Sequence, residues 1–222
     1  MKKAVFFDLD GTLINSVPDV ALACQKMLAE LQRPILPESR IQAFLGKGAR
    51  TLVARCLSND ITHYEVDKDV LEPALQLFRQ YYRQHNGEKA TLYPYTRETL
   101  DTLYSMGVTL ALVTNKPSAF TPDLLKKFQL DHYFDLLVCG DTCEHEKPHP
   151  APILYALETL NLTASEVVFV GDSENDTLAA QAAQMDVLLL PYGYTEGKSL
   201  SDLNPTAFIQ DLRGVIDYIV QN

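Results

Sequence analysis

A short stretch near the N-terminus decides the reading of this chain: Phe6-Phe7-Asp8-Leu9-Asp10-Gly11-Thr12. It continues the apolar pair Ala4-Val5, and an unbroken apolar run of this kind predicts a strand that is buried on both faces. Asp8 and Asp10 begin as neighbours, because residues i and i+2 of a strand share a face. Gly11 then permits a sharp turn that releases the second carboxylate from the strand.

Two carboxylates at this spacing repel each other unless a cation lies between them or one of them holds a proton. A hard, oxygen-binding ion such as Mg²⁺ fits that requirement. One carboxylate then serves as a nucleophile and the other as a general acid/base. The alternative is a capped turn at the end of a strand, since Asp-Gly is a common turn pair. The stretch taken alone leaves both interpretations open.

Composition limits the class of protein. The chain has 222 residues, enough for one large domain or for a core with an insertion. Its 46% hydrophobic and 22% charged residues are typical of a globular protein. The net charge of −10 argues against general nucleic-acid binding, for which a basic stripe is expected. An acidic protein that acts on a phosphate must gather positive charge locally, from a metal and a few Lys or Arg residues.

The sequence also bears on location. It has no run of about 18 apolar residues, so we expect no membrane span and no membrane partner. The N-terminus is basic, but its apolar segment breaks at Asp8 and is too short for the core of a signal peptide, which predicts a cytoplasmic protein.

The four cysteines are scattered, as reduced thiols in a reducing compartment are. Cys139 and Cys143 lie near His145 and His149, but this spacing matches no common zinc pattern.

Short apolar runs alternate with helical patterns along most of the chain. This alternation predicts an α/β fold with a parallel sheet, right-handed crossovers and helices on both faces, and ligands at the carboxyl ends of the strands. The expected strands are 4–7, 108–113, 136–139, 167–170 and 187–190. The expected helices are 96–105, 119–128, 151–160, 175–184 and 212–220, the last after a surface loop over 192–205.

One interval breaks the alternation. Residues 16–88 carry only helical patterns, over about 19–31, 38–44, 50–57 and 69–85, with prolines at their starts and stops. An insertion of this length after the first strand predicts a second, smaller domain. Its return passes through Asn86-Gly87-Glu88, which we interpret as a hinge.

Three further polar sites follow predicted strands, as Asp8 does. After strand 108–113 come Thr114-Asn115-Lys116, whose hydroxyl and amide suit phosphate oxygens or, alternatively, cap the next helix. Lys147 lies between Glu146 and the Pro148-His149-Pro150 turn, which stiffens the backbone around it; a lone lysine in such a turn is also consistent with a surface residue.

The third site is Gly171-Asp172-Ser173-Glu174-Asn175-Asp176, after strand 167–170. Asp172 is placed to share a metal with Asp8. Asp176, one helical turn further on, is placed to hold a metal-bound water or to brace Lys147. The alternative is an acidic first turn that stabilises a helix N-terminus.

Together these four sites resemble the four motifs of the haloacid dehalogenase superfamily, and the helical insertion resembles its α-helical cap. More narrowly, the chain is similar to the bacterial phosphoglycolate phosphatases. The resemblance covers essentially the whole chain and implies a Rossmann-like core at 1–15 and 89–222 and a small cap domain at 16–88. The segments that carry the narrower similarity are 44–50, 85–88, 92–94 and 192–194. The chain departs from the pattern at Tyr95, where Gly is expected, and at Ala183-Gln184-Met185, where Ala-Gly is expected before the last strand.

The resemblance also implies roles. Asp8 would attack phosphorus to give an aspartyl-phosphate, and Asp10 would act as acid and then base. Mg²⁺ would be bound by Asp8, the backbone carbonyl of Asp10 and Asp172, with Asp176 near it. Thr114, Asn115 and Lys147 would bind the transferring phosphoryl group. An acid/base at position 10 favours phosphoryl transfer over dehalogenation.

Substrate choice is expected in the cap. Gly46-Lys47-Gly48 and Arg50 form a short basic loop, and we hypothesise that Lys47 or Arg50 binds the carboxylate of 2-phosphoglycolate. The alternative is a helix start with solvated basic residues.

Other functions stay open at this point. One is a phosphatase for another small phosphoester, such as a sugar phosphate, and another is a phosphoglucomutase-like phosphotransferase. A third, of a different class, is a non-catalytic phosphoester-binding regulatory protein, because a fold alone does not establish function. The sequence does not indicate the oligomeric state.

Overall fold

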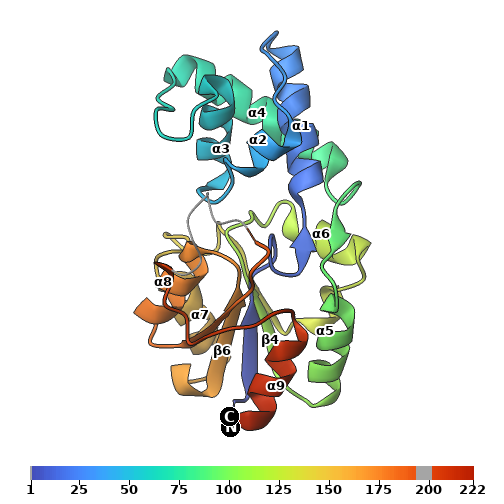
Figure 1. The fold of residues 1–222 in the computed structure, drawn as a ribbon, viewed down its shortest axis with the longest axis vertical. Coiled ribbons are helices and arrows are strands. Elements are labelled where there is room, and N and C mark those ends of the chain that lie inside the picture. Colours follow the sequence, from blue (N-terminus) through green and yellow to red (C-terminus); the bar gives the residue numbers. More distant parts are fainter. Residues whose placement is uncertain (1, 194–201) are drawn as a thin grey trace. The chain divides into compact units, whose positions relative to one another are not determined.

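The computed structural model describes residues 2–193 and 202–222 and divides into two compact units (Figure 1). One unit consists of Met1–Asn15 and Leu92–Asn222, and the other consists of Ser16–Thr91. The sequence places the corresponding boundaries after residues 15 and 88. That the second unit acts as a cap stays a prediction.

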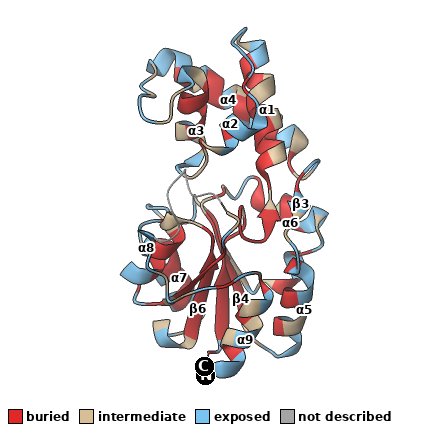
Figure 2. Ribbon diagram, viewed as in Figure 1, coloured by how far each residue is buried: buried red, intermediate tan, exposed pale blue. Residues whose placement is uncertain are grey.

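A six-stranded parallel sheet forms the centre of the first unit, in the order β5-β4-β1-β6-β7-β8. Every residue of β1 is fully buried, as its apolar sequence predicts (Figure 2). β4 and β6 flank β1, so the chain segments that follow these three strands emerge side by side at one edge of the sheet. The strands are β1 (Ala4–Phe7), β4 (Thr109–Val113), β5 (Leu136–Val138), β6 (Val167–Gly171), β7 (Asp186–Leu189) and β8 (Ala207–Phe208).

Helices cover both faces of this sheet, as predicted. Figure 1 shows α7 and α8 on one side and α5 and α9 on the other. On the first side, Ile153 of α7 and Ala180 of α8 pack with Phe6 and Phe169 in one buried cluster. The helices are α5 (Thr96–Ser105), α6 (Thr121–Lys127), α7 (Ala151–Thr159), α8 (Glu174–Ala182) and α9 (Arg213–Gln221), with short 3₁₀ turns at Asp131–Tyr133 and Ala164–Glu166.

The expected boundaries differ from the observed ones where local turns compete with the sheet. Val108 lies outside β4 because its N–H bonds to Leu103 O, in the turn that ends α5. Cys139 lies outside β5 because its N–H donates to Thr142 Oγ1. The sequence did not predict β8, nor the two-residue pair β2 (Ile14–Asn15) and β3 (Thr91–Leu92). Most of the expected surface loop over 192–205 lies outside the described residues.

The second unit is helical, as predicted. It contains α1 (Val17–Glu30), α2 (Glu38–Gln42), α3 (Gly48–Ser58) and α4 (Lys68–His85). α1 packs against α4, and the buried carboxylate of Asp19 in α1 accepts hydrogen bonds from Gly87 N at 2.7 Å and Lys89 N at 2.6 Å. The start of α1 is therefore tied to the segment interpreted as a hinge. None of the helices in the described parts of the chain is long and apolar enough to span a membrane.

Candidate active site

The site lies at the carboxyl edge of the sheet, where the segments after β1, β4, β5 and β6 meet. Asp8 directly follows β1, Thr114 follows β4 and Asp172 follows β6. Lys147 lies in the loop between β5 and α7, and Asp176 lies in the first turn of α8. All five side chains are buried or nearly so, and four of them are charged; charged groups are rarely buried unless they are paired.

Asp8 is fixed by its backbone and only partly neutralised. Its N–H donates to Val170 O at 3.0 Å, which continues the β1–β6 pairing. Lys147 Nζ lies 3.1 Å from Asp8 Oδ1, an ion-pair distance without hydrogen-bond alignment, and this buried oxygen accepts no hydrogen bond from the described residues. Burial raises the pKa of Asp8 from 3.8 to about 6, against the opposing effect of Lys147.

Lys147 is the central cation of the site. Its Nζ donates to Val113 O and to Asp176 Oδ1, both at 2.7 Å, and the residue is 2% exposed. Burial by itself lowers the pKa of this ammonium, but the charges of Asp176 and Asp8 outweigh it, so the pKa of Lys147 is raised. The lysine therefore stays protonated beside the carboxylates.

Asp176 holds this lysine in place and also stabilises the first turn of α8. Its Oδ1 accepts from Lys147, while Oδ2 accepts from Asp172 N at 3.2 Å, Ser173 N at 3.0 Å and Ser173 Oγ at 2.7 Å. Ser173 and Asp176 form a capping box. The brace and the helix-start interpretations therefore both hold for this residue.

Asp172 lies in a space kept open by glycines. Thr12 Oγ1 donates to its Oδ1 at 2.7 Å. A Cβ atom at Gly11 would lie 2.4 Å from Asp172 Oδ2, and one at Gly193 would lie 1.9 Å from the same oxygen. Both positions therefore exclude side chains. Thr12 and the two glycines were not among the predicted site residues, although Gly11 and Thr12 belong to the first motif.

The carboxylates of Asp8, Asp172 and Asp176 offer oxygens that all lie within 4.8 Å of one another. They form the one such group of three or more potential metal ligands in residues 2–193 and 202–222. An all-oxygen donor set and a buried Asp8 oxygen without a donor fit a hard divalent cation. The Asp10 side chain does not belong to this group, and the expected contribution of its backbone carbonyl stays a prediction.

Thr114 and Asn115 lie beside the site, and both are engaged locally. Asn115 Nδ2 donates to Lys147 O at 2.7 Å, and its Oδ1 accepts from Lys147 N at 2.9 Å. The amide therefore clamps the backbone of the lysine, a contact between residues 32 positions apart. Thr114 Oγ1 accepts from Lys116 N at 3.2 Å.

Asp10 has a partner that the sequence analysis did not assign. Lys116 Nζ lies 3.1 Å from Asp10 Oδ1 and 3.0 Å from Oδ2, and this lysine is 7% exposed. Lys116 directly follows Thr114-Asn115. The position of Lys116 shortly after the central strand β4 was the feature of the sequence that could have indicated this contact.

Lys47 and Arg50 lie in the helical unit, where Lys47 directly precedes α3 and Arg50 lies in its first turn. The Arg50 side chain is 55% exposed and forms an ion pair with Glu72 of α4. Its charge is therefore already matched within this unit.

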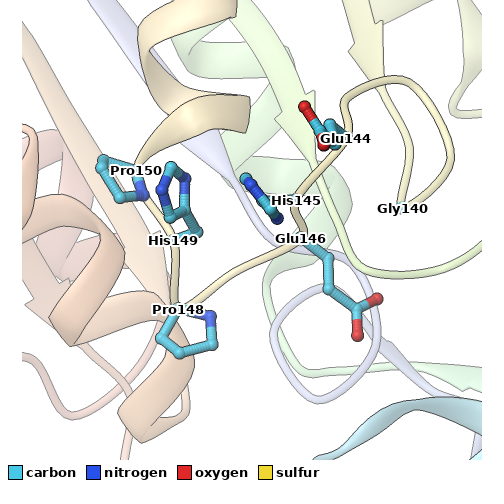
Figure 3. A pocket seen from close by; sticks show the side chains of 7 residues that line it. All are labelled: Gly140, Glu144, His145, Glu146, Pro148, His149 and Pro150. Carbon is cyan, nitrogen blue, oxygen red and sulfur yellow. The ribbon is translucent and has the colours of Figure 1, made fainter.

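A separate pocket of about 660 Å³ is lined by residues of the loop between β5 and α7 (Figure 3). The rings of His145 and His149 are 4.6 Å apart in it, and His149 Nδ1 accepts from Ala151 N at 3.1 Å. That bond occupies one ring nitrogen of His149. None of the predicted catalytic side chains lines this pocket.

Comparisons with family models, with protein sequences and with solved structures all indicate the same family. Residues 5–190 match the model of the haloacid dehalogenase-like hydrolases. The chain is 43% identical over 216 residues to a phosphoglycolate phosphatase of Pseudomonas savastanoi pv. phaseolicola, with 97% of this chain and 79% of that protein covered. It is 40% identical over 222 residues to a phosphoglycolate phosphatase of Psychrobacter arcticus, with 99% and 96% covered.

Among solved structures, a predicted phosphoglycolate phosphatase from Haemophilus somnus superposes with a TM-score of 0.92 at 33% identity, over 98% of both chains. The chain belongs to the haloacid dehalogenase-like hydrolase family. The resemblance stated from the four motifs is confirmed, as is the prediction of an enzyme, a hydrolase similar to phosphoric monoester hydrolases.

Proposed function

We propose that this protein is a Mg²⁺-dependent phosphomonoester hydrolase that acts through an aspartyl-phosphate on Asp8. The observation that supports this most strongly is the state of the Asp8 carboxylate. It is buried beside Lys147 and Asp172, and one of its oxygens accepts no hydrogen bond from the described residues. A carboxylate in that state is positioned and incompletely stabilised, as a nucleophile requires.

In the first step, an Asp8 oxygen forms a bond to phosphorus while the bond from phosphorus to the ester oxygen breaks. Asp10 gives its proton to the departing oxygen, which leaves as an alcohol. In the second step, water attacks phosphorus and gives a proton to Asp10, and the bond between Asp8 and phosphorus breaks. The products are inorganic phosphate and the enzyme in its starting protonation state.

The surrounding groups stabilise charge on the phosphoryl oxygens. Lys147 supplies a fixed positive charge. Asp176 orients its ammonium, and Asn115 holds its backbone in place. Thr114 would donate its hydroxyl proton to a phosphoryl oxygen. Asp8, the Asp10 carbonyl and Asp172 would bind Mg²⁺, and Asp176 would lie near the ion. When bound, the ion would supply Lewis-acid stabilisation of the transferring group.

We propose 2-phosphoglycolate as the substrate. Support comes from the names of relatives at 40–43% identity that match over almost the whole chain. Lys47 or Arg50 would bind the glycolate carboxylate. If Arg50 does so, its guanidinium must leave the ion pair with Glu72. A cytoplasmic location is consistent with the four cysteines, which are all free thiols.

Phosphate release from 2-phosphoglycolate and from a panel of sugar phosphates, each with Mg²⁺ and with EDTA, tests this proposal. We expect Mg²⁺-dependent turnover with a preference for 2-phosphoglycolate. Equal or better turnover of sugar phosphates would retain the chemistry and refute the substrate. Isomerisation of a sugar phosphate without phosphate release would identify a mutase, and binding without turnover would identify a regulatory protein.

A further inference from the structure

Each of the two carboxylates Asp8 and Asp10 lies next to its own buried lysine. Lys147 pairs with Asp8, and Lys116 pairs with Asp10 through both carboxylate oxygens, at 3.1 and 3.0 Å. The sequence motifs assign a role to Lys147 but none to Lys116. Lys116 is 7% exposed and contacts the Asp10 carboxylate, and burying an ammonium is costly unless it is paired.

Lys116 is itself anchored from three directions. Its N–H donates to Thr114 Oγ1 at 3.2 Å. Its carbonyl accepts from Gly140 N at 3.0 Å and from Thr121 Oγ1 at 3.4 Å, which ties it to the segment after β5 and to the start of α6. These bonds fix the backbone of Lys116 at the edge of the sheet, and with it the starting position of its side chain.

The two partners differ in exposure. The Lys116 side chain is 4% exposed, whereas that of Asp10 is 26% exposed. The ammonium thus contacts Asp10 from the protein side, and part of the carboxylate remains open to solvent. A carboxylate that exchanges a proton with a bound reactant needs this arrangement, with one side held and one side accessible.

We infer that Lys116 is a positioning residue that holds the Asp10 carboxylate in its place for proton transfer to the departing oxygen. This inference rests on the proposed function, in which Asp10 is the acid/base. It assigns to Lys116 an effect on the proton transfers of Asp10 and none on the binding of the phosphoryl group. Breakage of the ester bond depends on Asp10 when the departing group is an alkoxide, and much less when the departing group is stable without a proton.

The test compares kcat/KM for two substrates, because this constant reports the steps through the first departure. 2-Phosphoglycolate leaves a poor alkoxide, whereas 4-nitrophenyl phosphate leaves a stable phenolate. For Asp10→Asn we expect a loss of about 10²–10⁴-fold on 2-phosphoglycolate and a far smaller loss on 4-nitrophenyl phosphate. For Lys116→Met we expect the same pattern at a smaller size, on the order of 10²-fold on 2-phosphoglycolate.

Lys116→Arg serves as the matched variant, since a guanidinium can contact both oxygens of a carboxylate. We expect it to restore part of the loss on 2-phosphoglycolate. Retained turnover of 4-nitrophenyl phosphate shows in the same assay that Lys116→Met is folded, and a thermal melt of each variant checks this independently.

Equal losses on both substrates for Lys116→Met would overturn the inference, because they would indicate contact with the phosphoryl group or damage to the fold. An unchanged kcat/KM for both substrates would overturn it as well. If Asp10→Asn itself lost activity equally on both substrates, the acid role of Asp10 in the proposed function would fail together with the inference. A substrate-dependent loss in Asp10→Asn alone would refute only the role of Lys116.

Discussion

The charged groups at the edge of the sheet differ in burial from the Arg50–Glu72 ion pair of the helical unit. At the edge of the sheet, Asp8, Asp172, Asp176 and Lys147 are buried, and Lys147 forms ion pairs with Asp8 and Asp176. In the helical unit, the pair of Arg50 with Glu72 is exposed to solvent. Buried charges lose hydration that their partners only partly replace, whereas an exposed pair loses little and gains little. Substitutions should therefore have large effects at the edge of the sheet and small ones at the Arg50–Glu72 pair.

The largest expected effect is on turnover by Asp8→Asn. The change keeps the shape of the side chain and removes the nucleophile, so we expect kcat to fall by at least about 10⁴-fold. Phosphate release under saturating substrate measures this, and circular dichroism shows whether the fold is kept. Turnover within tenfold of wild type would contradict the assignment of the nucleophile.

The next largest effect is on stability, by Lys147→Met. The substitution leaves Asp8 and Asp176 buried without their cation, and removal of one partner of a buried pair costs about 3–5 kcal/mol. We expect the loss to be greater at pH 8 than at pH 5, because Asp8, whose pKa is raised to about 6, can take up a proton at the lower pH. Urea unfolding at both pH values measures it, and a loss that is equal at both would argue against this cause.

A smaller effect concerns pH and metal. The folded-state pKa of Asp8 is raised from 3.8 to about 6, so its contribution to stability is full below about pH 3.8 and is lost as the pH rises through about 6. A cation bound to the ionised carboxylate offsets this loss. We therefore expect Mg²⁺, relative to EDTA, to raise the melting temperature more at pH 7.5 than at pH 5.

Asp8→Asn is the matched control for that experiment, since the amide does not ionise. In this variant the Mg²⁺ shift should be smaller and should lose most of its pH dependence. A shift that stays the same in wild type and variant would place the ion elsewhere.

How far the sequence predicts this structure depends on the range of the interactions involved. The unbroken apolar run Ala4–Phe7 predicts a buried central strand because burial on both faces leaves a local pattern. The two residues of β8 leave no such pattern, since a strand this short depends on its neighbour β7. The motifs likewise predict that Asp8, Lys147 and Asp172 meet, but not that Lys116 contacts a residue 106 positions away.

The smallest expected effects are at the exposed Arg50–Glu72 pair of the helical unit. Arg50→Ala should leave the melting temperature nearly unchanged, because the ion pair with Glu72 is exposed. If Arg50 binds the substrate carboxylate, KM for 2-phosphoglycolate should rise on the order of tenfold while kcat changes little. Glu72→Gln is the matched variant and should leave KM equal or lower. An unchanged KM in Arg50→Ala would remove Arg50 from the substrate site.

The measurement that tests the central claim most directly is chemical trapping of the intermediate. The enzyme is mixed with Mg²⁺ and substrate, quenched in acid and reduced with borohydride, which converts an aspartyl-phosphate to homoserine. Mass spectrometry of the peptides then locates the change. We predict homoserine at position 8 only when substrate and Mg²⁺ are both present. Phosphate release without any modification of Asp8, or with modification at Asp10 in its place, would contradict the proposed mechanism.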